Sequence, residues 1–225
     1  YDFNTNSSRL ADFCNEDLSA FYFDTRKDVL YCDVGPAAPL GTDKRRAYRT
    51  VLDTLFHALV RYAAPVLVFT SEEVWGTRYP EAGSVHLLEW PILPTLNRHP
   101  RESGDPEPAS ADPTVGSRVR GNDELVERWA SIRAARVQVN EAIEPLRREK
   151  IVRSSLEAQV IMPPVANVAP EAMAEIAITA AVTYGGGGVT VTPTENHKCG
   201  RCWRHLPEVE ADGDLCNRCD TVLDA

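Results

Sequence analysis

The sequence lacks long hydrophobic runs and a surplus of positive charge. No stretch of eighteen apolar residues occurs, and no secretory signal opens the chain, so we expect no membrane partner and a reducing, cytoplasmic setting. Acidic residues outnumber basic ones by 33 to 24, and the formal net charge is -9. This charge argues against non-specific nucleic-acid binding, which depends on neutralising phosphates, although local basic clusters remain available for a shaped RNA contact.

Methionine is scarce as well, and the one glycine run carries no phosphate-loop pattern. Only Met162 and Met173 occur and residue 1 is Tyr, so we expect the chain to be a piece of a longer polypeptide. The four glycines at 185–188 are not followed by Gly-Lys-Ser/Thr, which predicts a flexible turn. With 225 residues and 43 % hydrophobic composition, the chain suffices for one core of moderate size plus an appendage.

Four of the six cysteines form two Cys-x-x-Cys pairs near the end of the chain. The pairs are Cys199 with Cys202 and, after thirteen intervening residues, Cys216 with Cys219. Paired knuckles of this kind supply the four thiolates of a tetrahedral structural zinc site. Two disulfides are the alternative, and we favour one zinc ion because a segment this short cannot bury a core of its own. His197 and His205 stand nearby, but four cysteines already complete a zinc shell.

Apolar residues recur at helical spacing through the first ninety residues. The pattern predicts a helix over about 4–27 and a second helix that begins after Thr42 or Asp43 and ends or kinks at Pro65. The inward-facing residues expected on the second helix are Ala47, Val51, Leu55, Ala58, Leu59 and Tyr62. Short turns between such helices are typical of an antiparallel bundle.

A third and a fourth helix complete this pattern. The third opens near Thr70, with Val74 and Trp75 pointing inward, and the fourth runs from Asp123 to about Lys150. Between them, a stretch at about 94–122 is rich in Pro, Gly, Ser, Asp and Arg, which predicts a flexible insert.

Beyond the fourth helix the hydrophobic period changes. Residues 156–162 alternate as a strand, 171–178 suit a short helix, and 189–192 suit a second strand. The sequence therefore predicts a mainly α protein with three parts. They are a helical bundle at 1–150 interrupted by the insert, a small α+β junction at 151–194, and a four-cysteine zinc ribbon at 195–225.

Four stretches carry motifs specific enough to suggest a family. They are Phe21-Tyr22-Phe23-Asp24, Phe69-Thr70-Ser71-Glu72-Glu73-Val74-Trp75, Ser154-Ser155-Leu156-Glu157-Ala158 and Lys198-Cys199-Gly200-Arg201-Cys202-Trp203. In this order they resemble the C-terminal third of bacterial isoleucyl-tRNA synthetases, which are class I aminoacyl-tRNA synthetases. The resemblance covers nearly the whole chain except residues 97–122.

The resemblance implies an anticodon-binding helical bundle, a junction and a zinc-binding end that together hold tRNA(Ile). The family joins isoleucine to this tRNA with ATP and magnesium. The His-Ile-Gly-His-like and Lys-Met-Ser-Lys-Ser-like motifs of its catalytic domain do not occur here, nor does any stretch resembling its editing domain. We therefore name no catalytic residue, and we expect the chain to be inactive alone, with ATP and Mg bound only by the missing catalytic domain. We also expect a monomer that packs on the missing N-terminal catalytic and editing domains of the parent chain.

Candidate tRNA contacts are clustered cations and one tryptophan beside a knuckle. They are Trp203, Arg201 and Arg204 in the zinc end, Lys44, Arg45, Arg46 and Arg49 at the start of the second helix, and Arg147, Arg148, Lys150 and Arg153 at the end of the fourth. Trp203 could stack a base or could simply pack the ribbon against the bundle, and each cation could lie on a solvated helix face.

Two other functions stay open at this point. The knuckle pair also resembles the zinc finger of formamidopyrimidine-type DNA glycosylases, whose spacing between knuckles is longer. A purely structural zinc clip would touch no nucleic acid.

Overall fold

The computed structural model describes residues 3–92 and 115–224 and divides the chain into two compact units. Of the described residues, 3–92 belong to unit 1 and 115–224 belong to unit 2. Most of the insert predicted at about 94–122 lies outside the described residues. Where description resumes, at Val115, the backbone is already helical, so the fourth helix begins before the predicted Asp123.

Unit 1 opens with one long helical run. It consists of α1 (Phe3–Asp12), the wider-turned π-helix η1 (Phe13–Phe23) and α2 (Asp24–Cys32). The sequence predicted that this run ends near Lys27, but it continues to Cys32. The longer helix places two further apolar side chains, Val29 and Cys32, in the interior.

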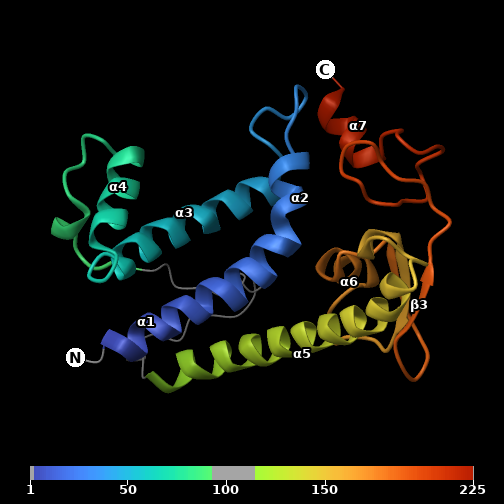
Figure 1. The fold of residues 1–225 in the computed structure, drawn as a ribbon, viewed down its shortest axis with the longest axis horizontal. Helices are drawn as coiled ribbons and strands as arrows, with labels where there is room; N and C mark the ends of the chain where they lie inside the picture. The colour runs from blue at the N-terminus through green and yellow to red at the C-terminus, as the bar shows by residue number, and fades with distance from the viewer. Residues whose placement is uncertain (1–2, 93–114, 225) are drawn as a thin grey trace, which may run out of the picture. The chain divides into compact units, whose positions relative to one another are not determined.

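The run is followed by α3 (Asp43–Ala63), α4 (Val68–Arg78) and the 3-10 turn η2 (Val85–Leu87). Figure 1 shows α3 returning antiparallel to the α1–α2 run. Helix α3 packs on α2 and on α4. Thr42 caps α3 as predicted, because its Oγ1 accepts a hydrogen bond from the Arg45 backbone N–H at 3.3 Å.

Part of the core of unit 1 lies where α3, α4 and η2 meet. One cluster of this core comprises Val60, Ala64, Trp75 and Val85, with Phe56, Tyr79 and Leu88 packed against them. Other buried apolar residues of unit 1, among them Leu18, Val29 and Tyr48, lie on the first helical run and on α3. The Trp75 indole N–H donates to the Gly83 carbonyl oxygen at 3.1 Å, which satisfies the buried ring. The inward position of Trp75 is thus confirmed.

Some of the predicted inward faces were wrong. Val74 and Val51 are both 42 % exposed, whereas Tyr48 is buried on α3. The Tyr48 ring packs edge-on against Tyr22, with ring centroids 5.3 Å apart, so the helical run before α3 selects a different face of α3.

Unit 2 combines a long helix with a small sheet. Its elements are α5 (Val115–Arg148), η3 (Ser155–Glu157), β1 (Ala158–Met162), α6 (Pro170–Ala177), β2 (Ala181–Tyr184), β3 (Thr190–Pro193) and α7 (Asn217–Leu223). The strand order is β2-β1-β3, with β1 parallel to β2 and antiparallel to β3. Strands β1 and β3 match the predicted strands, whereas β2 was missed.

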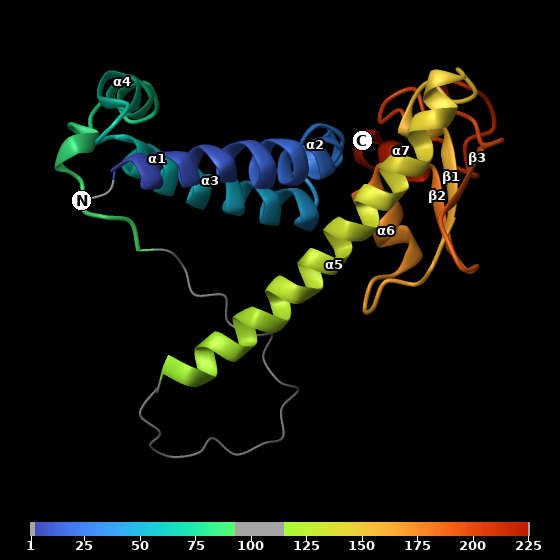
Figure 2. The same cartoon turned by 60° about the horizontal axis from the view of Figure 1, so that its bottom comes forward.

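The core of unit 2 lies between the sheet and the helices. Strand β1 buries alternate residues, and α5 packs on α6 and on β3 (Figure 2). The buried side chains of α5 include Ile132, Val139 and Ile143, which recur at intervals of seven and four residues and so share one face of the helix. Trp129, on the same face, is 38 % exposed.

The described part of the chain is therefore mainly helical with a small sheet, as predicted. The antiparallel bundle over residues 1–150 and the boundaries at 150/151 and 194/195 stay predictions. None of the helices within the described ranges is both long and apolar enough to cross a bilayer.

Candidate functional site

The two Cys-x-x-Cys knuckles converge on one buried centre. The sulfur atoms of Cys199, Cys202, Cys216 and Cys219 all lie within 4.8 Å of one another, and all four residues are buried. All six cysteines of the chain are free thiols, so the structure does not support the two-disulfide alternative. Among the described residues, these four cysteines form the one group of ligating side chains, and neither nearby histidine belongs to it.

Backbone hydrogen bonds shape each knuckle. In the first, the Cys199 N–H donates to the Arg204 carbonyl oxygen at 2.9 Å, and the Trp203 N–H donates to the Cys199 carbonyl oxygen at 3.0 Å. In the second, Cys216 precedes α7 and Cys219 lies in its first turn. The Cys216 N–H donates to the Cys199 sulfur at 3.3 Å, which joins the two knuckles.

A close backbone approach holds the knuckles together. The Gly200 N–H donates to the Asp214 carbonyl oxygen at 3.0 Å, and the Gly213 N–H donates to the Lys198 carbonyl oxygen at 2.9 Å. A Cβ at Gly200 would lie 2.3 Å from the Gly213 oxygen, so a side chain is excluded there. Gly213 lies in a turn between the knuckles, because this residue has a φ of +105° and the Asp214 N–H donates back to the Ala211 carbonyl oxygen.

The dimensions of the centre fit a zinc ion. Four sulfurs at about 2.3 Å from a tetrahedral zinc lie about 3.8 Å from each other. The Cys202 and Cys216 sulfurs are 3.7 Å apart, which matches that spacing and exceeds a disulfide bond. The four cysteines would therefore hold one structural zinc ion.

The pKa values of the thiols reflect the burial and crowding of the four sulfurs. Burial works against ionisation of Cys199, but hydrogen bonds from backbone amides lower its pKa to about 6. Burial, together with the neighbouring Cys219 sulfur, raises the pKa of Cys216 to about 11. Burial also raises the pKa of Cys202. Four adjacent thiolates repel each other, and a bound cation removes that repulsion.

Beside the first knuckle, an indole ring faces solvent. Trp203 is 62 % exposed and has a left-handed backbone with φ of 64°, which is uncommon for an aromatic residue. The Lys198 ammonium lies 5.4 Å from the centre of its ring. Arg201 and Arg204 are half-buried on either side of Cys202 and Trp203. Trp203 is therefore an exposed ring in the described part of the chain, and its role in stacking a base stays a prediction. Lys198, beside this ring, was not among the candidates from the sequence.

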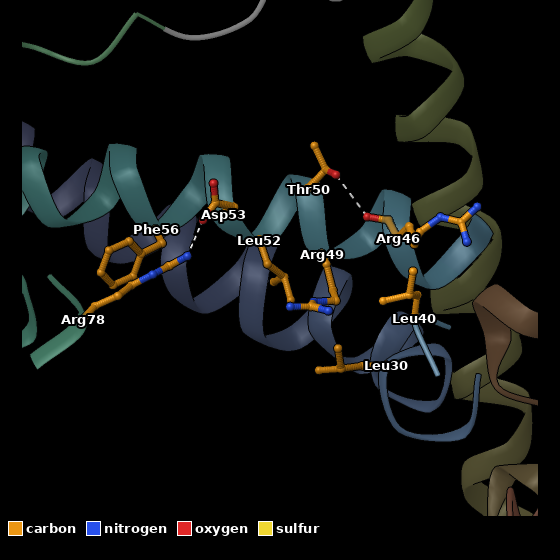
Figure 3. Close-up of a pocket in the computed structure, with 9 residues that line it drawn as sticks. All are labelled: Leu30, Leu40, Arg46, Arg49, Thr50, Leu52, Asp53, Phe56 and Arg78. Carbon is orange, nitrogen blue, oxygen red and sulfur yellow. Dashed lines mark hydrogen bonds and ion pairs between the residues drawn. The ribbon is translucent and has the colours of Figure 1, made fainter. Parts of the chain in front are cut away.

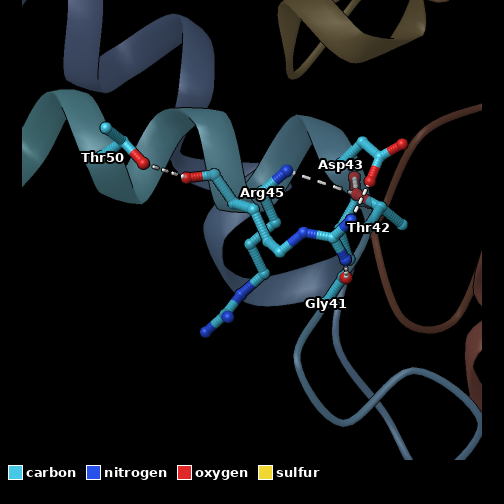
Figure 4. A network of polar contacts seen from close by, with 7 residues as sticks. Gly41, Thr42, Asp43, Arg45 and Thr50 are labelled. Carbon is cyan, nitrogen blue, oxygen red and sulfur yellow. Dashed lines mark hydrogen bonds and ion pairs between the residues drawn. The ribbon is translucent and has the colours of Figure 1, made fainter.

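The cations at the start of α3 fall into different environments (Figure 4). Arg45 Nε donates to the Leu30 carbonyl oxygen at 2.8 Å, so its guanidinium joins α3 to the end of α2. Arg46 donates to the Gly41 carbonyl oxygen at 3.1 Å and pairs with Asp43. Lys44 and Arg49 are both exposed.

The four cations at the end of α5 are all exposed. They are Arg147, Arg148, Lys150 and Arg153. The Arg148 Nε lies 3.5 Å from the Glu144 carboxylate, an exposed pair that leaves most of the side chain in solvent. Lys150 has a φ of 59°, so the helix ends in a left-handed residue and the backbone then turns away.

The fold and the centre define a class: a largely helical module that carries a four-cysteine zinc ribbon. Residues 1–162 match the family described as anticodon-binding domain of tRNA ligase, and residues 196–222 match a zinc finger found in FPG and IleRS. The chain therefore belongs to the family of anticodon-binding domains of tRNA ligases. The family resemblance inferred from the motifs is confirmed.

Similar full-length proteins are isoleucine--tRNA ligases. The ligase of Zymomonas mobilis is 54 % identical over 98 % of this chain, that of Gluconobacter oxydans is 40 % identical over 95 %, and that of Ruegeria pomeroyi is 38 % identical over 99 %. The chain spans only 22 %, 21 % and 22 % of the length of these relatives. The match over residues 1–162 to an anticodon-binding domain favours neither alternative, the DNA-binding zinc finger or the purely structural zinc clip without tRNA readout.

Proposed function

We propose that this chain is the tRNA-recognising part of an isoleucine--tRNA ligase, which attaches isoleucine to tRNA(Ile) using ATP. The observation that carries the proposal is the 54 % identity to such a ligase over 98 % of the chain, together with the anticodon-binding family match. ATP and Mg²⁺ are bound by the catalytic domain of the longer ligase. The present chain contributes tRNA binding and no catalytic residue.

An anticodon loop suits the side chains that this chain exposes. Proteins read unpaired RNA by stacking bases on aromatic rings or arginine planes and by placing cations on phosphates. With a net charge of -9, the chain must rely on local cations. Trp203, flanked by Lys198, Arg201 and Arg204, is one such place, and the cations at the end of α5 are another. The single zinc ion is structural, because it fixes the knuckle from which Trp203 projects.

An exposed apolar surface on unit 1 suits contact with other domains of the ligase. Phe69 at the start of α4 is 88 % exposed and Leu87 in η2 is 85 % exposed. The His86 Nε2 lies 3.2 Å from the Val68 carbonyl oxygen, which holds these two segments together. We propose that the catalytic and editing domains of a monomeric, cytoplasmic ligase cover this surface. Phe69→Ser would then leave the melting temperature of this chain unchanged and lower that of the full-length ligase.

The direct test measures binding of the 225-residue chain to a tRNA(Ile) transcript near physiological salt. A second transcript differs only in its anticodon. We expect tighter binding to the transcript with the native anticodon, because the matching family is an anticodon-binding domain. Absence of binding to both transcripts would refute the proposal for this chain.

Charge reversal tests the α5 end separately. We expect Arg147→Glu with Arg148→Glu to weaken transcript binding at least about tenfold, since cations at these positions would meet phosphates. Both side chains are exposed, so the thermal melt should not change. Arg9→Glu with Lys27→Glu makes the same charge change at exposed positions of unit 1 and should weaken binding much less.

A further inference from the structure

An open pocket of about 690 Å³ lies along α3 in unit 1. Its walls come from the end of α2, the loop before α3, one face of α3 and the end of α4 (Figure 3). Leucines form its apolar side: Leu30, Leu40 and Leu52. Arginines at both ends give it positive charge, with Asp53 as the one acid among the lining residues.

At one end of the pocket, Arg78 presents a fixed guanidinium. The guanidinium carbon lies 4.3 Å from the centre of the Phe56 ring, and a terminal nitrogen pairs with the Asp53 carboxylate. The ring holds the guanidinium from one side and the carboxylate holds it from another, while the Arg78 side chain remains 40 % exposed. An arginine plane held in this way is a surface on which a nucleobase can stack.

At the middle of the pocket, Arg49 supplies a cation that the fold does not use. The guanidinium groups of Arg45 and Arg46 donate hydrogen bonds to backbone carbonyl oxygens. Arg49, in contrast, makes no hydrogen bond or ion pair among the described residues of unit 1. Figure 3 shows the Arg49 side chain lying over the leucine side of the pocket. Arg49 and Asp53 are one helical turn apart, about 6 Å along α3, so the free cation and the arginine plane are neighbours.

From these contacts, we infer that the pocket takes one unpaired nucleotide of bound RNA. Its base stacks on Arg78 over Phe56, and a phosphate next to it pairs with Arg49. The inference rests on the proposed tRNA binding, and it adds Arg78 and Phe56, which the sequence clusters did not contain, to Arg49, which they did. An acidic peptide would match the cations, but it would make no use of the flat face that Phe56 and Asp53 hold in place.

Two variants separate the two contacts in the 225-residue chain with a tRNA(Ile) transcript. Arg49→Gln removes the phosphate partner, so affinity should fall about fivefold and the slope of log K against log salt should lose about 0.7, the contribution of one single-strand phosphate. Arg78→Lys keeps the charge and the ion pair with Asp53 but removes the planar group. Affinity should fall roughly five- to tenfold with the salt slope unchanged.

Controls separate failure of the pocket from failure of the proposed function. Arg9→Gln, an exposed cation of α1, should change the affinity less than about twofold, and thermal melts should show that every variant is folded. If the unmodified chain binds the transcript and both pocket variants bind it as tightly as the unmodified chain, the pocket inference is wrong and the proposed function stands. The pocket would then serve another ligand, such as an acidic segment of protein. If Arg78→Lys lowers the salt slope as Arg49→Gln does, no base stacks there. If the unmodified chain does not bind, both proposals fail.

Discussion

Replacing Gly200 by alanine should open the zinc centre without touching a ligand. The added Cβ would lie 2.3 Å from the Gly213 carbonyl oxygen and 3.1 Å from its carbon, so backbone must move. The same segment carries the hydrogen bond from Gly200 to Asp214 that brings the knuckles together. Forcing such an overlap into a packed site costs about 1–3 kcal/mol.

This cost translates directly into zinc affinity. Metal binding and folding of a small zinc ribbon are one process, so a loss of about 1–3 kcal/mol weakens zinc binding roughly 5- to 150-fold. The affinity can be measured by competition with a chromophoric chelator, and the absorption of the cobalt-substituted protein reports whether the four-sulfur shell survives. Gly187→Ala is the matched control, because a Cβ at Gly187 meets nothing within 4 Å. Equal zinc affinity of Gly200→Ala and the unmodified chain would refute this account of the ribbon.

Three further predictions concern the two units. Removing zinc with a chelator should expose the ribbon amides to hydrogen exchange while β1 stays protected, because its buried residues belong to the sheet and not to the knuckles. Thr42→Ala should lower the free energy of unfolding by about 1–2 kcal/mol in a denaturant titration, because the cap of α3 and the 2.8 Å hydrogen bond to Asp33 are lost. Thr54→Ala on the same helix removes only an exposed hydrogen bond to the Thr50 carbonyl oxygen and should cost less than half as much. Glu72→Ala should cost about 1–2 kcal/mol, because one carboxylate oxygen accepts two hydrogen bonds from the start of η2 at 2.9 and 3.0 Å and Ala has no acceptor. Glu73→Ala, at an exposed position of the same helix, should cost far less, and equal costs would contradict this account.

The features that were predictable from sequence are those fixed by short-range chemistry. Two knuckles at a defined spacing determine a four-sulfur centre, whatever surrounds them, and the structure brings all four sulfurs together. Likewise Thr42 caps α3 through a contact three residues away, and the alternation in β1 follows from its own sequence. Strand β2 was missed because its four residues run into the glycines and it pairs with β1 only after the α6 crossover.

The inward faces of α3 and α4 were less predictable, because neighbouring elements decide them. Val51 and Tyr48 are both apolar enough for a core, and the periodicity of α3 allows either face. Tyr48 is buried because Tyr22, far away in sequence, lies against it. Burial of this kind depends on tertiary contacts that no local pattern contains.

The arginines show that the candidate functional residues, too, depend on tertiary contacts that the sequence pattern does not contain. Arg45, Arg46 and Arg49 form one basic cluster in the sequence, and nothing in the cluster ranks them. The position of α2 decides that Arg45 serves the fold through its hydrogen bond to the Leu30 carbonyl oxygen, while Arg49 stays exposed. Arg78 lies in no cluster, and its candidate role exists only because α3 and α4 bring it over Phe56. A charge cluster in a sequence therefore locates a basic surface, but the fold decides which cations remain available to RNA. Comparing the RNA affinities of Arg49→Gln and Arg78→Lys tests whether these two arginines are the available ones.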